Sequence, residues 1–289
     1  MESTELVRPD ARKSLLQLRE EWRSCVRCPL GVKRLEREGQ FVFGQGTLNS
    51  IMLIGEGPGV DEEEAGVPFI GNSGKLLHKI LALIGMTEFY MTNIVTCRSC
   101  APQENPDGTP AMRVRNFITK IPEPVYKDEP PTPLHYNACL PRLHEEIYLV
   151  DPIVIVGLGG TACEVLEGGH VTITRDRGKP VQIEIPGASF SPSLTEKKEA
   201  WARKGKVAPT EQNMVRYHFI PTLHPAYVIR KLSDQHLDSP LMQLVNDLRT
   251  ALKTYETYRE LVYNILPTST TVNDDNDYIQ KQFQQEAQE

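Results

Sequence analysis

Glycines, an acid, an amide and a histidine follow apolar segments of this chain, and together these residue types can form a binding pocket. One turn, Gly55-Glu56-Gly57-Pro58-Gly59, comes directly after an apolar run. Glycine leaves room for a ligand because it has no side chain and tolerates positive φ. The turn matches neither the triphosphate-binding G-x-x-x-x-G-K-S/T loop nor the dinucleotide-binding G-x-G-x-x-G motif. The sequence therefore favours a pocket lined by backbone, for another kind of ligand.

Two further polar residues fit such a pocket. Asn93 lies within an apolar run, and a buried amide needs hydrogen-bond partners, which at the end of a strand are often ligand atoms. His224 comes just after another apolar run and precedes a proline. A histidine in this position is either a structural residue or a proton donor in the pocket. The residues alone leave both interpretations open.

The six cysteines are too few for a disulfide scaffold in a chain of 289 residues, so we first consider them as metal ligands or small buried hydrophobic residues. Two C-x2-C pairs occur, at residues 25–28 and 97–100. The gap between them is far wider than in a zinc ribbon. A second set of four keeps the first three cysteines and replaces Cys100 with Cys139. Spacing does not choose between the two sets.

The elements that must position these residues can be predicted from hydrophobic patterns. Four short apolar runs predict buried strands, and they alternate with segments of helical periodicity. The predicted strands are 51–55, 91–96, 153–157 and 217–222, and the predicted helices are 11–23, 75–84, 140–150, 161–167 and 241–261. This alternation predicts parallel strands joined by right-handed crossovers in a doubly wound α/β layer. Ligands of such sheets bind beyond the carboxyl ends of the strands, where the polar residues above occur.

Two segments interrupt this pattern within a predicted single domain at 11–265, and a tail follows the domain. Residues 98–138 contain eight prolines and are expected to form a long, mostly extended insertion, with one short helix near 114–118. Residues 187–216 carry more positive than negative charge, so they are either a DNA-contacting surface loop or a solvated insertion without a partner. Residues 266–289 are acidic and rich in Gln, and we expect them to be disordered and available to a partner protein.

Composition excludes several classes of protein. The net charge is -6, with 39% hydrophobic and 24% charged residues, which is typical of a soluble globular protein. An acidic chain is not a globally electropositive nucleic-acid binder. No apolar run reaches the roughly 18 residues that a membrane span needs. The N-terminus also lacks the basic and apolar regions of a signal peptide. We therefore expect neither secretion nor membrane insertion.

Several short motifs occur along the chain in a fixed order. They are Cys25-x2-Cys28-Pro29-Leu30, the turn at 55–59 followed by an acidic cluster, Pro68-Phe69-Ile70-Gly71-x-Ser73-Gly74, Thr92-Asn93-Ile94-Val95-Thr96-Cys97-Arg98, Cys139 before an apolar helix, Arg177-Gly178, and His224-Pro225-Ala226-Tyr227. In this order the set resembles the iron-sulfur uracil-DNA glycosylases, family four of that superfamily, and phage proteins related to them. The resemblance implies a three-layer α/β/α sandwich with a short, mainly parallel central sheet.

The resemblance also implies a cofactor. A [4Fe-4S] cluster would be held by Cys25, Cys28, Cys97 and Cys139, and it would tie the N-terminal segment to the sheet. A zinc site is the alternative. The chain departs from the family in its long insertion at 98–138 and in Cys100, where proline is more familiar.

For the pocket, the resemblance implies a role for each matching residue. Phe69 would stack on a flipped uracil, and Asn93 would read the N3 and O4 edge of that base. His224 would donate to uracil O2 as negative charge develops on the leaving base. Backbone groups around the turn would line the same pocket, at Gly55, Glu56 and Gly57.

Two roles are less closely defined. The best-known uracil glycosylases have an aspartate where this chain has Gly57, so the acid that positions the catalytic water would be Glu56 or Glu62. A wedge that replaces the flipped base in the duplex would come from the residues after the histidine. These are Val228, Ile229 and Arg230, whose other interpretation is plain loop packing.

The function that follows is a monofunctional uracil-DNA glycosylase of base excision repair, a hydrolase that releases uracil and leaves an abasic site. The alternative is a non-catalytic member of the superfamily, acting as a DNA-binding or replication accessory factor. Phe69, Asn93 and His224 favour the enzyme, whereas the insertions and acidic tail fit the accessory factor. We expect a monomer that binds uracil-containing DNA. Its expected location is the cytoplasm, either associated with the nucleoid or in a phage-infected bacterial or archaeal cell.

Overall fold

A six-stranded sheet forms the centre of the protein. The computed structural model describes residues 14–114, 122–186, 214–231 and 239–265. The strands are β1 (Gln45–Gly46), β2 (Ile51–Gly55), β3 (Phe89–Asn93), β8 (Val154–Leu158), β9 (Val181–Pro186) and β10 (Met214–Thr222). Their order is β1-β3-β2-β8-β10-β9, in which the four inner strands are parallel and the two edge strands are antiparallel. The mainly parallel sheet predicted from the sequence is confirmed.

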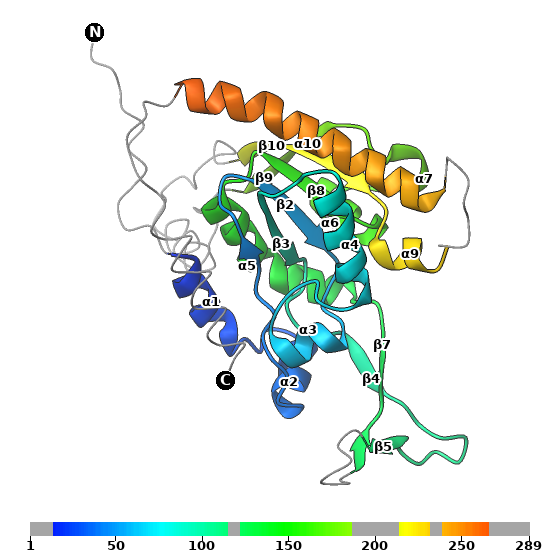
Figure 1. Cartoon of the computed structure of the whole chain (residues 1–289). Coiled ribbons are helices and arrows are strands. Elements are labelled where there is room, and N and C mark those ends of the chain that lie inside the picture. Colours follow the sequence, from blue (N-terminus) through cyan, green and yellow to red (C-terminus); the bar gives the residue numbers. More distant parts are fainter. Residues whose placement is uncertain (1–13, 115–121, 187–213, 232–238, 266–289) are drawn as a thin grey trace, which may run out of the picture.

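Helices cover both faces of this sheet (Figure 1). They are α1 (Leu15–Arg23), α2 (Pro29–Glu36), α3 (Val60–Ala65), α4 (Asn72–Leu83), α5 (Pro133–Val150), α6 (Gly160–Glu167), α7 (Ile173–Asp176), α9 (Pro225–Ile229) and α10 (Pro240–Ile265). Buried side chains of α5 and α6 form one core with the sheet, and those of α4, α9 and α10 form a second. Every residue of β2 and β8 is buried, because both faces of these strands are covered. The predicted three-layer α/β/α sandwich is confirmed.

The differences from the predicted elements have local causes. The strand predicted at 91–96 runs instead from Phe89 to Asn93, and the two residues after it, Ile94 and Val95, donate to the carbonyls of Gly55, which ends β2, and of Glu56. Helix α5 begins seven residues earlier than predicted. Its first residue is Pro133, which is compatible with the first helical position because the missing N–H has no partner there.

The proline-rich insertion forms an extended arm that leaves the body beside α3 (Figure 1). Two antiparallel pairs build it, β4 (Cys100–Pro102) with β7 (Tyr126–Asp128), and β5 (Met112–Val114) with β6 (Pro122–Pro124). The helix predicted near 114–118 falls mostly on residues outside the described ranges, and Val114 itself ends β5. Of the basic loop predicted at 187–216, residues 187–213 lie outside the described ranges, as does the acidic tail. Residues 214–216 are not loop as predicted but begin β10, where they pair with β9.

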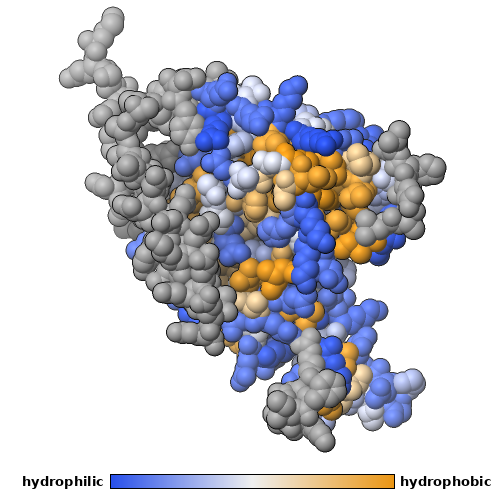
Figure 2. Space-filling view, viewed as in Figure 1, coloured by the Kyte–Doolittle hydropathy of each residue, from blue (hydrophilic) through white to orange (hydrophobic). Residues whose placement is uncertain are grey.

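On the face seen in Figure 1, hydrophilic residues surround several apolar areas, the most extensive of which lies around α9 and the adjoining part of α10 (Figure 2). Large hydrophobic side chains that reach the surface include Leu83 of α4 and Tyr227 of α9. In the part of the chain that the structure describes, no helix combines the length and the apolar character needed to span a membrane.

Candidate active site

A cavity of about 290 Å³ lies at the carboxyl ends of β2, β3 and β10. It is lined by the turn after β2, by the start of α4, by the end of β3, by the turn after β10 and by one residue of the arm. The lining residues are Gly57, Pro58, Gly59, Val60, Asp61, Glu62, Phe69, Gly71, Asn72, Ser73, Asn93, Asp128 and His224. Five of the residues singled out in the sequence therefore meet in one pocket, which we call the base pocket. They are Gly57, Glu62, Phe69, Asn93 and His224.

Phe69 forms one wall of the base pocket in an unusual backbone conformation. Its φ is 57° and its side chain is 5% exposed. Two glycines make room for it. A Cβ at Gly74 would lie 1.8 Å from the Phe69 carbonyl oxygen, and one at Gly55 would lie 2.8 Å from Phe69 Cζ and 2.5 Å from Asn93 Oδ1. Gly55 thus lies behind the phenyl ring and the amide, where no larger residue fits.

Asn93 is buried at the last position of β3, where it pairs with Gly55. No described residue hydrogen-bonds to its side-chain amide, which borders the base pocket. Its backbone carbonyl accepts a hydrogen bond of 2.8 Å from Arg142 Nη2, which also donates to the Ile94 carbonyl over 2.6 Å. The amide is therefore held in place through its backbone, while its donor and acceptor remain available to a ligand.

A buried polar network supports the same strand from α5. Arg142 and Glu146 form an ion pair one helical turn apart, and both are fully buried. The Glu146 carboxylate also accepts hydrogen bonds from Tyr90, at 2.8 Å, and from Thr92, at 3.2 Å. These residues were not predicted from the sequence. The signal was available, because two opposite charges four residues apart in a largely apolar helix indicate a buried pair.

His224 is a neutral hydrogen-bond donor to the base pocket. It caps α9, where its Nδ1 accepts the Ala226 N–H over 3.1 Å. The proton of the neutral ring therefore lies on Nε2. Burial, and then the nearby charge of Arg230, lower the pKa of His224 to about 4. The ring stays uncharged near neutral pH, and its Nε2–H remains available to donate a hydrogen bond.

The two acids that could position the catalytic water, Glu56 and Glu62, have different surroundings. Glu62 is tied to the backbone of the pocket, because its Oε1 accepts the Gly71 N–H over 2.8 Å and its Oε2 accepts the Gly59 N–H over 3.1 Å. Asp61, which the sequence analysis did not single out, is exposed and also lines the base pocket. Glu62 therefore joins the two loops that form the pocket.

Glu56 lies on a second cavity, of about 250 Å³, which we call the acid chamber. The acid chamber shares Gly57, Pro58 and His224 with the base pocket, and its remaining walls are Glu56, Ser99, Glu129, Pro130 and Pro131. Glu56 Oε1 lies 3.1 Å from the hydroxyl oxygen of Tyr136, a residue that the sequence analysis also missed. Glu56 is thus next to the base pocket, on the other side of the turn.

The structure corrects one of the residues expected in the wedge. Val228 is fully buried in the core formed by α4, α9 and α10, so its side chain is not available to enter DNA. Its position on the inner side of α9 explains this, since that short helix packs against α4. Ile229 is half-buried and Arg230 is exposed. Only these two of the three residues reach the surface.

Four of the six cysteines lie near one another. Cys139 is within electrostatic range of Cys25, Cys28 and Cys97, and all six cysteines are free thiols. Burial raises the pKa of Cys97 to about 11, against the lowering effect of Arg34. Across the described residues, no group of three or more His, Cys, Asp or Glu side chains is close enough to hold a single metal ion.

Cys100 has different neighbours from these four. It is buried among Arg37, Arg98, Glu63 and Asp128, whose charges act on its thiol. The structure therefore groups Cys139, and not Cys100, with the other three cysteines.

Arg34 provides a positive charge beside the four grouped cysteines. It is 3% exposed and adjoins Cys97. Its Nη1 and Nη2 donate to the backbone carbonyls of Gly39 and Arg23, at 3.2 and 2.6 Å, whereas its buried Nε has no partner. Four thiols beside a buried cation with a free N–H fit an anionic thiolate-ligated cluster.

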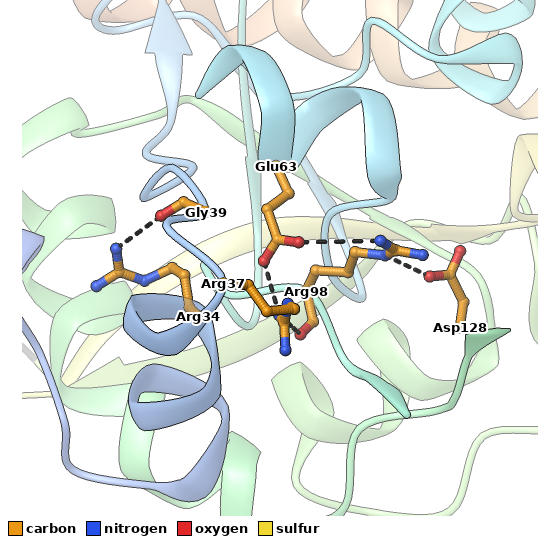
Figure 3. A network of polar contacts seen from close by, with 6 residues as sticks. All are labelled: Arg34, Arg37, Gly39, Glu63, Arg98 and Asp128. Carbon is orange, nitrogen blue, oxygen red and sulfur yellow. Dashed lines mark hydrogen bonds and ion pairs between the residues drawn. The ribbon is translucent and has the colours of Figure 1, made fainter. Parts of the chain in front are cut away.

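A second ionic network attaches the arm to the body (Figure 3). Glu63 of α3 accepts from Arg37 over 2.8 Å and lies 3.9 Å from Arg98, and Arg98 Nε donates to Asp128 of the arm over 2.6 Å. Arg37, Glu63 and Arg98 are nearly buried. The network thereby fixes the position of Asp128, which lines the base pocket.

Comparison with known proteins agrees with this geometry. The family model of the uracil DNA glycosylase superfamily matches residues 43–249. The type-4 uracil-DNA glycosylase of Thermotoga maritima is 30% identical over 229 residues, which cover 78% of this chain and 88% of the relative. The type-4 enzymes of Pyrobaculum aerophilum and Archaeoglobus fulgidus are 30% and 31% identical, over 66% and 60% of this chain and 85% and 75% of the relatives. This chain therefore belongs to the uracil-DNA glycosylase superfamily.

Proposed function

We propose that this protein is a monofunctional uracil-DNA glycosylase of DNA repair, which hydrolyses the N-glycosidic bond of deoxyuridine in DNA. One observation carries the proposal. A single pocket joins an aromatic wall, Phe69, to an amide without a partner among the described residues, Asn93, and to a neutral histidine donor, His224. An aromatic face, a donor and acceptor pair and an anion-stabilising donor are the groups that a flipped uracil requires.

The base would be recognised on its face and along two edges. Phe69 stacks on the ring, a contact that contributes about 1 to 3 kcal/mol for a nucleic acid base. Asn93 accepts from N3–H and donates to O4, a combination that uracil offers and cytosine does not. His224 Nε2–H donates to O2, which gains negative charge as the bond to the sugar breaks. Selectivity then comes from Asn93 and rate acceleration from His224.

Hydrolysis needs a water molecule and an acceptor for its proton. We assign the acceptor to Glu56, because the carboxylate of Glu62 is already engaged by two backbone amides. A water oxygen bonds to C1′, the N1–C1′ bond breaks, and its electron pair leaves with the uracil anion. The water proton passes to Glu56. No lysine lines either cavity among the described residues, so a Schiff-base route with strand cleavage has no nucleophile there.

The flipped nucleotide must leave the duplex at a cost of a few kcal/mol. Ile229 and Arg230, which follow His224 at the surface, are the residues that we assign to the wedge. Arg230 would contact phosphate, and Ile229 would fill the space of the missing base. The basic segment at 187–216 is a further proposed DNA contact.

We propose a [4Fe-4S] cluster held by Cys25, Cys28, Cys97 and Cys139. The buried guanidinium of Arg34 beside Cys97 supports this assignment, since the thiolates of such a cluster would accept N–H groups. When bound, the cluster would act as a structural cross-link between the N-terminal segment, the loop after β3 and α5. The hydrolysis described above uses only side chains of the two cavities.

The remaining proposals concern the domain, the C-terminal tail, the substrate and the oligomeric state. We propose one domain at 11–265, with a C-terminal tail at 266–289 that is free to bind a repair or replication protein. The substrate would be uracil-containing DNA at the nucleoid, bound by a monomer.

The test is a uracil-containing oligonucleotide incubated with purified protein that has been checked for iron. We expect free uracil and an alkali-labile abasic site, with no strand cut before alkali. Asn93→Ala protein serves as the matched inactive control. Binding of the oligonucleotide without uracil release, on both single- and double-stranded substrates, would support the accessory-factor function instead.

A further inference from the structure

Tyr136 links the acid chamber to the base of the arm. Its hydroxyl oxygen lies 3.1 Å from Glu56 Oε1 and 2.6 Å from the backbone carbonyl oxygen of Pro131, the residue with which the arm returns to the body. Tyr136 is 8% exposed and its ring packs in the core with α5 and α6. The hydroxyl is thus held rigidly between an acid and a carbonyl that both line the acid chamber.

A hydroxyl group has one proton, but here it faces the Glu56 carboxylate and the Pro131 carbonyl, with the Thr161 side chain as a further hydrogen-bond neighbour. When Glu56 is ionised, the carboxylate is the stronger acceptor, because hydrogen bonds to charged groups are the stronger ones. When Glu56 has taken up a proton, the Glu56 O–H can donate to the tyrosine oxygen while the tyrosine proton turns to the Pro131 carbonyl. Both protonation states of the acid are therefore satisfied without movement of the backbone.

We propose that Tyr136 is a positioning residue for the hydrolytic reaction, which orients the Glu56 carboxylate and accommodates the proton that Glu56 receives from water. The proposal rests on the proposed function and deepens it, since it requires Glu56 to act on the catalytic water. Tyr136 does not line either cavity, so it acts through Glu56 and not on the substrate. Its contact with the Pro131 carbonyl connects the base of the arm to Glu56 through the same hydroxyl group.

The test is a double-mutant cycle measured on the chemical step. Single-turnover rates of uracil release are compared for wild type, Tyr136→Phe, Glu56→Gln and the double variant. We expect Tyr136→Phe to slow the wild-type enzyme by roughly 10- to 100-fold, the range for loss of a hydrogen bond to a charged group. In the Glu56→Gln protein the same change should alter the rate by less than about 2-fold. DNA affinity should be unchanged in Tyr136→Phe.

The control is Tyr148→Phe, which removes a half-buried tyrosine hydroxyl from the same helix, far from the acid chamber. Its rate should match wild type in both backgrounds. Equal rate losses for Tyr136→Phe with and without Glu56→Gln would overturn the positioning role, and so would a loss of rate that only follows a loss of folded protein in thermal melting. Wild-type protein that releases no uracil would remove the proposed function itself, and with it this role, so the two failures are distinguishable.

Discussion

The Nδ1 atom of His224 accepts a hydrogen bond from the backbone N–H of Ala226, with 3.1 Å between the two nitrogens. Because this bond fixes the neutral tautomer, and burial lowers the pKa of His224 to about 4, we expect the imidazole to titrate far below the usual value of 6.5. Nuclear magnetic resonance of the ring protons between pH 3 and 8 measures this directly. A midpoint near 6.5 would contradict a buried neutral donor.

The lowered pKa also predicts how stability depends on pH. Between pH 6.5 and about 4, the unfolded chain binds a proton at His224 and the folded protein does not. The contribution of this residue is therefore fully present above pH 6.5 and is lost as the pH falls towards 4. Urea unfolding of wild type and His224→Gln should show a free-energy difference that shrinks over this window.

His224→Gln protein should also release uracil roughly 10²- to 10³-fold more slowly at neutral pH.

Substitution of Asn93 should lower the reaction rate, whereas substitution of Arg142 should lower the stability of the fold. Asn93→Ala removes the amide that we propose reads the base, so we expect a rate lower by about 10²- to 10³-fold with little change in folding. Arg142→Met leaves Glu146 buried without its partner and frees the carbonyls after β3, so we expect a loss of about 3 to 5 kcal/mol in the free energy of unfolding. Denaturation curves and single-turnover rates for both variants test the distinction.

Glu62 and its neighbour Asp61 form a matched pair for testing what the Glu62 carboxylate does. Glu62→Ala leaves two backbone amides, of Gly59 and Gly71, without their acceptor, and should cost about 1 to 3 kcal/mol of stability. Asp61→Asn, at an exposed position of the same helix, should change stability by less than about 0.5 kcal/mol. A Glu62→Gln protein that is fully stable yet inactive would instead make Glu62 the catalytic acid.

Iron content should distinguish the two cysteine sets. Cys139→Ser removes a proposed cluster ligand, and we expect it to lose iron and soluble folding because three thiolates hold a [4Fe-4S] cluster poorly. Cys100→Ser should keep both, since that thiol lies among Arg37, Arg98, Glu63 and Asp128. Iron and zinc are measured in the purified proteins, together with the absorbance of the cluster. Loss of metal from Cys100→Ser alone would reverse the ligand assignment.

Glu63 should contribute far more to stability than an exposed acid with a similar contact. Glu63→Gln leaves Arg37 nearly buried without a charged partner and leaves Arg98 with Asp128 alone, with an expected cost of about 3 kcal/mol or more. Glu184→Gln breaks an ion pair with Arg216 of equal length at the surface, and should cost less than about 1 kcal/mol. Comparable losses in the two variants would show that the network in Figure 3 does not hold the arm.

The sequence could predict the four inner strands of the sheet and the residues at their ends, because a buried parallel strand is a continuous apolar run and the pocket lies beyond the ends of these runs. It did not predict the edge strands β1 and β9, which are not continuous apolar runs. It could not predict the contact between Glu56 and Tyr136, which are 80 positions apart, since nothing local in either segment refers to the other. Val228 was misassigned for a similar reason. Whether a residue of a one-turn helix faces solvent depends on its packing against α4, which the local pattern does not encode.

The tip and the base of the arm should differ in how well they tolerate changes of sequence. Beyond β4 and β7 the backbone hydrogen bonds run within the arm itself, as between Gln103 and Val125, and between Ala111 and Gln103. At the base, Asp128 and Pro131 are walls of the two cavities. Foreign sequence grafted between β5 and β6 would therefore be tolerated, and would hold a fused reporter or effector domain close to the lesion being repaired. A deletion that reached β7 would open the catalytic cavities to bulk solvent.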